Sequence, residues 1–364
     1  MSTNEGRRTP IAWPTLGIVG VTGAVGRVVL DVLPMRDPHW GRIRLAAGEE
    51  DVGSVCRVNG EDVVVEALEP AFFDGIDVAI FDIPPEIAQE WVEMAASRGV
   101  VAIDNSTAFR TRDDVPLVVP EVNSHKAVDR PRGIIANPGA TVMTMIDALA
   151  VLHAVWELTG LVVTTLQAAS GRGRAGMSRL YDEIEVVQGD RTLGTRPGDV
   201  RRLIEEELGA SPFPAPLAFN VIPFVGTHVS GGWTSEEVKV RDEIRKILDL
   251  PNLPVFATCV RVPVISSHSV VVHATFGRRI KVSEARQALV EAPAVVVLDD
   301  PDEPEFPTPN DAVGADPRFA GRIRQGADAP NTLELFISGD NLRKGAALNM
   351  VQTAELVAAE LRGV

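Results

Sequence analysis

The segment NPGAT, Asn137–Thr141, lies between an apolar run, GIIA, and a helix-like run, VMTMIDALAVLHAVW. A nucleophile at the start of such a helix would be well placed for covalent catalysis, but Ala140 has only a methyl group and cannot attack a carbonyl. Thr141 carries an unactivated hydroxyl, which is a weak nucleophile, and we expect its place in the helix to point it elsewhere. The chemistry of this chain therefore depends on what surrounds Ala140.

Two other residue types could carry chemistry. Arg261 lies inside an apolar run, ATCVRVPV, where a charge needs a partner, so we predict a binding role for it. The chain has only two cysteines, Cys56 and Cys259, which we interpret as free, reduced thiols in strands rather than as a disulfide or a nucleophile.

A glycine turn follows the first apolar strand in TLGIVGVTGAVGRVVLDVL. Its glycines allow the backbone to approach a phosphate, and the helix that follows offers unpaired N–H groups and the positive end of its dipole. The spacing predicts dinucleotide-fold geometry, and fold maintenance alone remains the alternative. The candidate cofactor-binding residues of this turn are Gly20, Thr22, Gly23, Ala24, Val25 and Gly26.

Strands and helices alternate after this turn, which predicts a Rossmann-type, doubly wound parallel sheet. Later β-rich runs separated by helices predict a second, α+β domain. The first domain is expected at 14–137, after a disordered leader at 1–13, and the second at 138–340. Expected strands are 42–47, 63–68, 77–83, 99–105, 161–170, 257–264 and 269–276, and expected helices 84–99 and 235–248.

Composition excludes several classes of function. The 364 residues are 45% hydrophobic and 23% charged, which is typical of a folded globular protein. A formal net charge of −15 argues against nucleic-acid binding. Apolar runs are too short to span a membrane, and the N-terminal segment lacks a signal peptide's apolar middle, so we expect a cytoplasmic protein. We expect no metal site.

Ten strings, in order, resemble the aspartate-semialdehyde dehydrogenase family and cover nearly the whole chain after the leader. The family reduces β-aspartyl phosphate to aspartate semialdehyde with NADPH through a cysteine thioester. The resemblance implies a homodimer, a second domain that serves substrate binding and dimerisation, and a C-terminal helix at 341–364 that completes the first domain. The strings are GVTGAVG, IDNSTAFR, VPLVVPEVN, GIIANP, QAASGRGRAG, FNVIPF, TSEEVKV, ATCVRVPV, PTPNDAVG and DNLRKGAALNMVQTAEL.

The resemblance assigns roles to individual residues of a pocket for an amino acid or acyl phosphate. It implies that Arg110 and Lys239 hold the phosphate, and that Arg261 pairs with the α-carboxylate. It further implies that Glu236 holds the α-amine and that Gln167 orients the reacting carbonyl. The remaining implied residues are His268 as the acid/base, Asn137 in the substrate site and Asn341 near the nicotinamide.

This chain departs from the family at three places. The family's Asn-Pro-Asn-Cys is Asn137–Ala140 here, so the catalytic cysteine is replaced by alanine. The family's Ser-Ala-Gly-Gly beside the cofactor is Asp82–Pro85, which removes backbone donors and adds a negative charge. Where the family has Arg-Ser, Glu50 and Asp51 disfavour the 2′-phosphate of NADP and leave NAD possible, with no cofactor as the alternative. Arg172 and Arg174 are additional cations whose direction the sequence does not decide.

Three hypotheses remain open at this stage. The leading one is a protein that keeps the aspartyl-phosphate pocket, has lost redox catalysis and performs a non-redox reaction such as acyl transfer. The second is a non-catalytic subunit that pairs with an active paralogue in a hetero-oligomer. The third is a conventional NAD(P)-dependent dehydrogenase with an engineered alanine or a substitute nucleophile.

Overall fold

The computed structural model describes residues 13–36 and 40–363. The predicted leader lies outside this part of the chain except for Trp13, whose ring lies 4.6 Å from the Arg362 guanidinium. The chain divides into two compact units, Met1–Asn137 with Ala347–Val364 (unit 1) and Pro138–Ala346 (unit 2). In the described part of the chain, no helix has the length and apolar character needed to cross a membrane.

Unit 1 is built on a seven-stranded sheet with the order β3-β4-β2-β1-β5-β6-β7. Every neighbouring pair is parallel except the β3–β4 hairpin. The strands are β1 Thr15–Val19, β2 Arg42–Ala47, β3 Val55–Val58, β4 Glu61–Ala67, β5 Val78–Phe81, β6 Val101–Asp104 and β7 Ile134–Ala136. The helices are α1 Ala24–Val32, α2 Pro85–Ser97, α3 Pro120–Asn123 and α11 Leu348–Arg362.

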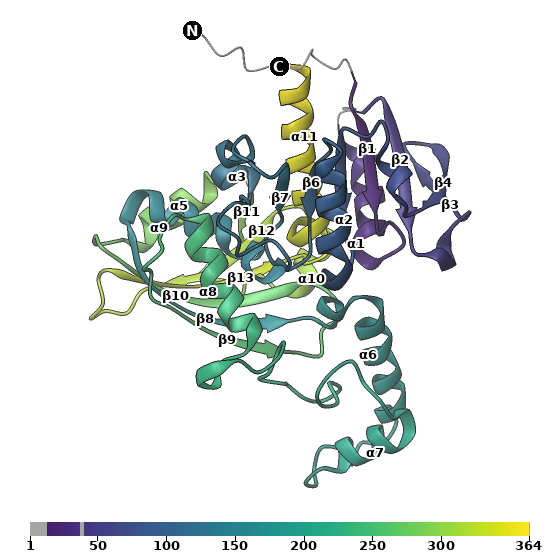
Figure 1. The fold of residues 1–364 in the computed structure, drawn as a ribbon. Coiled ribbons are helices and arrows are strands. Elements are labelled where there is room, and N and C mark those ends of the chain that lie inside the picture. Colours follow the sequence, from purple (N-terminus) through teal and green to yellow (C-terminus); the bar gives the residue numbers. More distant parts are fainter. Residues whose placement is uncertain (1–12, 37–39, 364) are drawn as a thin grey trace. The chain divides into compact units, whose positions relative to one another are not determined.

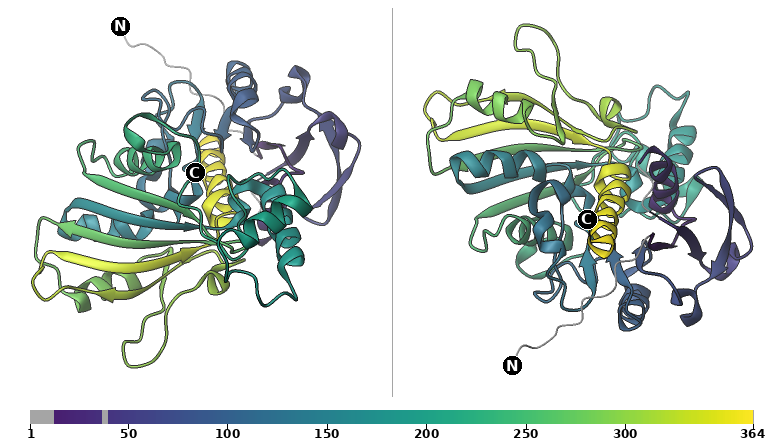
Figure 2. Two further views of the ribbon diagram at one scale, coloured as in Figure 1. Left: turned by 90° about the horizontal axis from the view of Figure 1, so that it is seen from below. Right: turned by 90° about the horizontal axis from the view of Figure 1, so that it is seen from above.

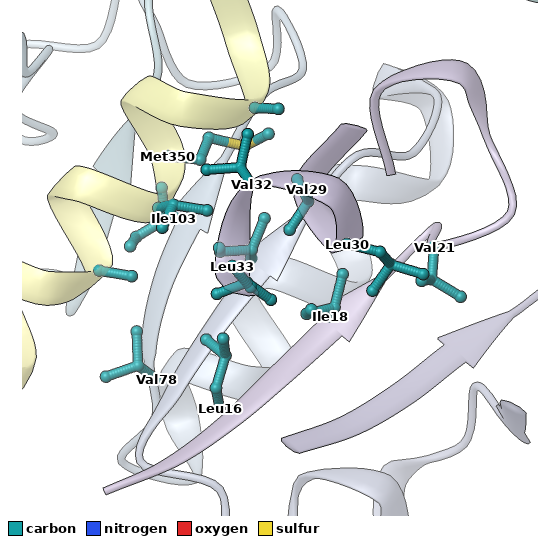
Figure 3. Close-up of a cluster of buried hydrophobic side chains, with 14 of the residues drawn as sticks. Leu16, Ile18, Val21, Val29, Leu30, Val32, Leu33, Val78, Ile103 and Met350 are labelled. Carbon is teal, nitrogen blue, oxygen red and sulfur yellow. The ribbon is translucent and has the colours of Figure 1, made fainter. Parts of the chain in front are cut away.

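Side chains alternate between the two faces of this sheet, as the period of a strand requires. Leu16 and Ile18 of β1 point to the face covered by α1 and the C-terminal α11, where Met350 joins the same buried cluster (Figure 3). On the opposite face, Phe81 of β5 packs against Phe73 beside α2. Burial on both faces explains the near-continuous apolar runs of these strands and confirms the predicted doubly wound sheet.

Unit 2 contains a six-stranded mixed sheet with the order β11-β12-β13-β10-β8-β9. Figure 2 shows its long strands side by side, with β13 antiparallel to β10. The strands are β8 Leu158–Gln167, β9 Val255–Arg261, β10 His268–Phe276, β11 Val295–Val297, β12 Arg318–Arg324 and β13 Thr332–Gly339. The helices are α4 Ala140–Met143, α5 Ile146–Trp156, α6 Gly173–Val187, α7 Asp199–Leu208, α8 Ser235–Ile247, α9 Val282–Val290 and α10 Pro309–Ala312.

One face of this sheet is covered by helices, because α5 packs on β8 and α8 on β9 (Figure 1). The expected α+β character of the second domain is therefore confirmed. The sequence did not predict β11, β12 and β13 as strands, although they form half of this sheet. The short helix α10 begins with a capping box between Thr308 and Asp311.

Candidate active site

The catalytic-cysteine position begins α4 in unit 2. Ala140 is the first residue of this four-residue helix, and the preceding Gly139 has φ −63° and ψ 139°, a conformation open to any residue. The Gly139 N–H donates to Glu243 Oε2 at 2.6 Å. The Ala140 methyl group faces Gly345, where an added Cβ would lie only 3.1 Å from it. The site is therefore closely packed around a side chain that has no nucleophilic atom.

Thr141 does not point away from the predicted pocket, so that expectation was wrong. Its side chain is 3% exposed, and its hydroxyl donates to Glu236 Oε1 at 2.8 Å. Gln167 Nε2 donates to the same carboxylate oxygen at 3.3 Å. Thr141, at the start of α4, and Gln167 thus both hold the Glu236 carboxylate in place. Glu236 and Gln167 had been predicted to belong to one pocket.

A capping box explains why α8 begins where it does. The Thr234 hydroxyl accepts the Glu237 N–H at 3.3 Å, and the Glu237 carboxylate accepts the Thr234 N–H at 2.8 Å. This fixed start places Glu236 in the first turn and Lys239 three residues later, on the same side of the helix. Lys239 is half-buried, and its ammonium makes no hydrogen bond or ion pair with any residue that the structure describes.

Arg261, at the end of β9, is 5% exposed. One guanidinium N–H donates to the Ala168 carbonyl at 2.6 Å, and the group lies 6.0 Å from the Phe213 ring. Within residues 13–36 and 40–363, no carboxylate lies within ion-pair distance of it. Burial lowers the pKa of Arg261 to about 10, and the nearby charge of Glu236 opposes this change. Arg261 therefore remains a buried cation at neutral pH, and an anionic partner would stabilise it.

His268 begins β10 and is 2% exposed. Its Nδ1 accepts the Ala168 N–H at 3.1 Å, which leaves the ring proton on Nε2. Burial, followed by the charge of Arg261, lowers its pKa to about 3, so the ring is neutral at physiological pH. Gly171 permits this close packing, since a Cβ there would lie 2.5 Å from Arg261 Nη1 and 3.4 Å from His268 Cε1.

Unit 2 also contains Asn341, predicted to lie near the nicotinamide. Its Oδ1 accepts hydrogen bonds from the Ser170 hydroxyl and the Ser267 N–H, both at 2.9 Å. These contacts tie together the two segments that hold Ala168 and His268. Neither serine was singled out from the sequence, because the link depends on contacts between residues far apart in the chain. The additional cations Arg172 and Arg174 are both exposed.

In unit 1, the predicted substrate residues Asn137 and Arg110 are held in place by hydrogen bonds to other asparagines. Asn137 Nδ2 donates to Asn105 Oδ1 at 2.9 Å, and Asn137 Oδ1 accepts from Asn349 Nδ2 at 2.7 Å. Arg110 donates to the Asn105 carbonyl at 2.6 Å. The buried Asn137 amide therefore fixes the end of β7 onto α11, while Asn105 positions Arg110.

The glycine turn of unit 1 is close-packed. Gly20 has φ +87°, and a Cβ there would lie 2.1 Å from the Asp82 carbonyl oxygen. A Cβ on Gly26 would lie 2.3 Å from the Gly20 carbonyl oxygen, so these two positions require glycine. Gly23 is the N-cap of α1. The other predicted residues, Thr22, Ala24 and Val25, lie in the turn and in the first turn of α1.

The carboxylate of Asp82 lies against this turn. It accepts a hydrogen bond from Asn105 Nδ2 at 2.8 Å, and its Oδ2 lies 3.5 Å from the position that a Cβ on Gly23 would take. Burial raises its pKa, while the hydrogen bond from Asn105, the nearby Gly26 N–H and the charge of Arg110 act in the opposite direction. The acidic pair predicted to oppose NADP, Glu50 and Asp51, lies in a 3-10 turn just after β2.

Neither cysteine is placed as a substitute nucleophile. Cys259 is fully buried in β9, and burial raises the pKa of its thiol to about 12, so it is protonated at physiological pH. Its predicted character as a buried strand thiol is confirmed. Cys56 is a half-buried thiol in the β3 hairpin of unit 1.

Comparison with known proteins decides the family. Residues 15–130 match the model of the semialdehyde dehydrogenase NAD binding domain, and residues 149–344 match that of the semialdehyde dehydrogenase dimerisation domain. An aspartate-semialdehyde dehydrogenase of Streptomyces akiyoshiensis is 44% identical over 96% of this chain and 99% of its own length. This chain belongs to the aspartate-semialdehyde dehydrogenase family.

Other aspartate-semialdehyde dehydrogenases support the same assignment. The enzyme of Mycolicibacterium smegmatis is 39% identical over 95% of this chain and 99% of its own length. The crystal structure of aspartate-semialdehyde dehydrogenase II of Vibrio cholerae, complexed with ASA, is 34% identical, with a TM-score of 0.87 over 96% of this chain and 99% of that one. The family resemblance and the fold class predicted from the sequence are confirmed, and unit 1 contains a nucleotide-binding domain of the NAD(P) type.

Proposed function

We propose that this family member binds an amino acid whose side-chain carboxyl group is activated as an acyl phosphate, β-aspartyl phosphate or a close relative, and transfers its acyl group without redox chemistry. The observation that carries the proposal is Arg261, a buried guanidinium with no carboxylate at ion-pair distance among the described residues. A buried charge without a partner is unfavourable, so retaining it favours a site that receives an anion.

The contacts within unit 2 support a specific orientation of the ligand. Arg261 pairs with the α-carboxylate, and Glu236, held by the Thr141 hydroxyl, pairs with the α-amine. Gln167, hydrogen-bonded to Glu236, orients the reacting carbonyl. Lys239 on α8 binds the phosphate, for which an ammonium is a suitable partner.

Ala140 removes the family's route through a thioester, and the Cys259 thiol is buried and protonated. Transfer then requires direct attack by an external amine or water on the acyl carbon. The new bond forms to that carbon, the bond between it and the phosphate oxygen breaks, and inorganic phosphate leaves with the electron pair while the nucleophile's proton passes to water. The neutral His268, with its proton on Nε2, donates a hydrogen bond to the developing oxyanion rather than accepting a proton.

The nucleotide-binding unit retains at most weak affinity for a dinucleotide under this proposal. Glu50 and Asp51 favour NAD over NADP, because carboxylates accept from ribose hydroxyls and repel a 2′-phosphate. Pro84 and Pro85 withhold two backbone donors from the segment after β5.

A homodimer accompanies this proposal. Val162, Phe256 and Val271 come from the adjacent strands β8, β9 and β10 and are exposed, with Phe256 56% exposed. A sheet face of this kind is suited to a second copy of the same chain, since covering apolar area is favourable. Light scattering should give twice the chain mass, and Phe256→Asp should give a monomer.

The test is release of inorganic phosphate from β-aspartyl phosphate with water or a primary amine as acceptor, measured above the uncatalysed rate. We expect catalysed release, and Lys239→Met should lower it at least tenfold. The matched control is Lys281→Met, because Lys281 is exposed and pairs only with its helix neighbour Glu284 among the described residues. Release at the uncatalysed rate by the unmodified protein would refute acyl transfer.

A further inference from the structure

Asp82 lies where a dinucleotide-binding fold normally presents N–H groups to phosphate. We propose that its carboxylate is a resident anion that takes the place of a nucleotide phosphate at the start of α1, and that this single residue excludes dinucleotides from unit 1. The inference goes beyond the proposed acyl transfer, because it assigns a specificity-determining residue to the nucleotide unit and uses no residue of the pocket in unit 2.

The first support is the position of the carboxylate. Gly26 is the third residue of α1, and its N–H is one of the donors that a helix leaves unpaired at its start. The Asp82 carboxylate faces this helix start, since its Oδ2 lies 3.5 Å from the position that a Cβ on the N-cap Gly23 would take, and α1 has no acidic residue of its own in the first turn. The carboxylate therefore lies where a bound phosphate would use these donors.

The second support is the rigidity with which Asp82 is held. Its Oδ1 accepts from Asn105 at 2.8 Å, and its Oδ2 lies 3.5 Å from the Cβ position of Gly23. Its backbone presses on the turn, since a Cβ on Gly20 would lie 2.1 Å from the Asp82 carbonyl. The Asp82 side chain is held by Asn105 after β6 and packs against the glycine turn, while its own backbone follows β5. A ligand therefore cannot displace the carboxylate by a simple rotation of the Asp82 side chain.

The chemical consequence is repulsion of a diphosphate. A dinucleotide brings two negative charges to the glycine turn, and two like charges a few ångströms apart in a partly buried site repel strongly. The glycines remain necessary even so, because the turn must still accommodate the Asp82 backbone. Retention of Gly20 and Gly26 therefore does not require a bound cofactor.

The experiment is calorimetric titration of NAD and of ADP-ribose into the unmodified protein, Asp82→Asn and Asp82→Ser. Asparagine removes the charge while preserving the shape, and serine also opens space beside the turn. We expect both variants to bind at least tenfold more tightly than the unmodified protein, equivalent to about 1.4 kcal/mol. Asp31→Asn is the matched control, because Asp31 is an exposed aspartate on the same helix and its replacement makes the same change in net charge.

Tight binding of NAD by the unmodified protein, or equal gains in Asp31→Asn, would overturn the proposal. If Asp82→Asn fails to fold, Asp82→Ser supplies the same comparison, with thermal unfolding recorded for both. Inorganic phosphate release from β-aspartyl phosphate, measured on the same samples, reports the pocket of unit 2 separately. If the unmodified protein releases no phosphate above the uncatalysed rate, the proposed function is contradicted, but the proposal for Asp82 is not affected.

Discussion

Replacing Arg261 by methionine should separate ligand binding from stability. The fall in the pKa of Arg261 to about 10 corresponds to about 3 kcal/mol by which the site disfavours the charged guanidinium relative to water. An anionic ligand offsets this penalty, and an apolar side chain avoids it. We therefore expect Arg261→Met to be at least as stable as the unmodified protein, because the avoided penalty exceeds the roughly 1 kcal/mol lost with the hydrogen bond to Ala168.

Ligand affinity should change much more. Truncating one partner of a buried charge pair costs roughly 2–5 kcal/mol, so binding of a phosphonate analogue of aspartyl phosphate should weaken about 30-fold or more. Calorimetry measures the affinity, and chemical denaturation measures the free energy of unfolding. The prediction is a large loss of affinity with little loss of stability.

Arg179→Met provides the contrasting control in the same unit. Arg179 is also buried, at 7% exposed, but it pairs with Glu183 at 2.9 Å and donates to the carbonyls of Leu208, Gly209 and Ala210. Breaking this satisfied pair should lower the free energy of unfolding by about 3–5 kcal/mol and leave ligand affinity unchanged in the folded fraction. The reasoning is refuted if Arg261→Met binds the analogue normally, or if it is destabilised as much as Arg179→Met.

Further predictions concern the nucleophile, the histidine and the acidic pair. Ala140→Cys should oxidise aspartate semialdehyde at a turnover rate below about 1 per second, because Asp82 still prevents the cofactor from binding. NAD(P)H formation at a higher rate would contradict this. The folded protein keeps His268 neutral down to about pH 3, whereas the same histidine in the unfolded chain binds a proton below about pH 6.5, so the free energy of unfolding falls as the pH falls. Between pH 7 and pH 5, denaturant titrations should show the unmodified protein losing about 2 kcal/mol more of this free energy than His268→Gln. In the Asp82→Asn background, where we expect dinucleotides to bind, Glu50→Arg with Asp51→Ser should shift the affinity ratio toward NADP at least tenfold in calorimetry. An unchanged ratio would mean that this pair does not face the ribose.

The sequence was sufficient for the features that depend on local patterns. The alternation of strand-like and helix-like runs predicted the parallel sheet of unit 1, and the apolar run around Arg261 indicated a charge that needs a partner. The direction of Thr141 was predicted wrongly, because its hydrogen bond joins it to Glu236, 95 residues later in the chain.

Two further features depend on contacts that no local pattern contains. The tautomer of His268 is fixed by the Ala168 N–H, which is 100 residues away in sequence. Asp82 could be recognised from the sequence as an added charge, but its position against the glycine turn depends on how β5 pairs with β1. Side-chain direction and protonation therefore required the folded structure.

The central claim is that this chain keeps the acyl-phosphate pocket of its family without the redox step. The most direct test is one reaction that contains the protein, β-aspartyl phosphate, NADPH and an amine, with NADPH absorbance and inorganic phosphate recorded together. The account predicts that phosphate is released faster than in the absence of protein while NADPH is not consumed. Oxidation of one NADPH for each phosphate released would contradict it.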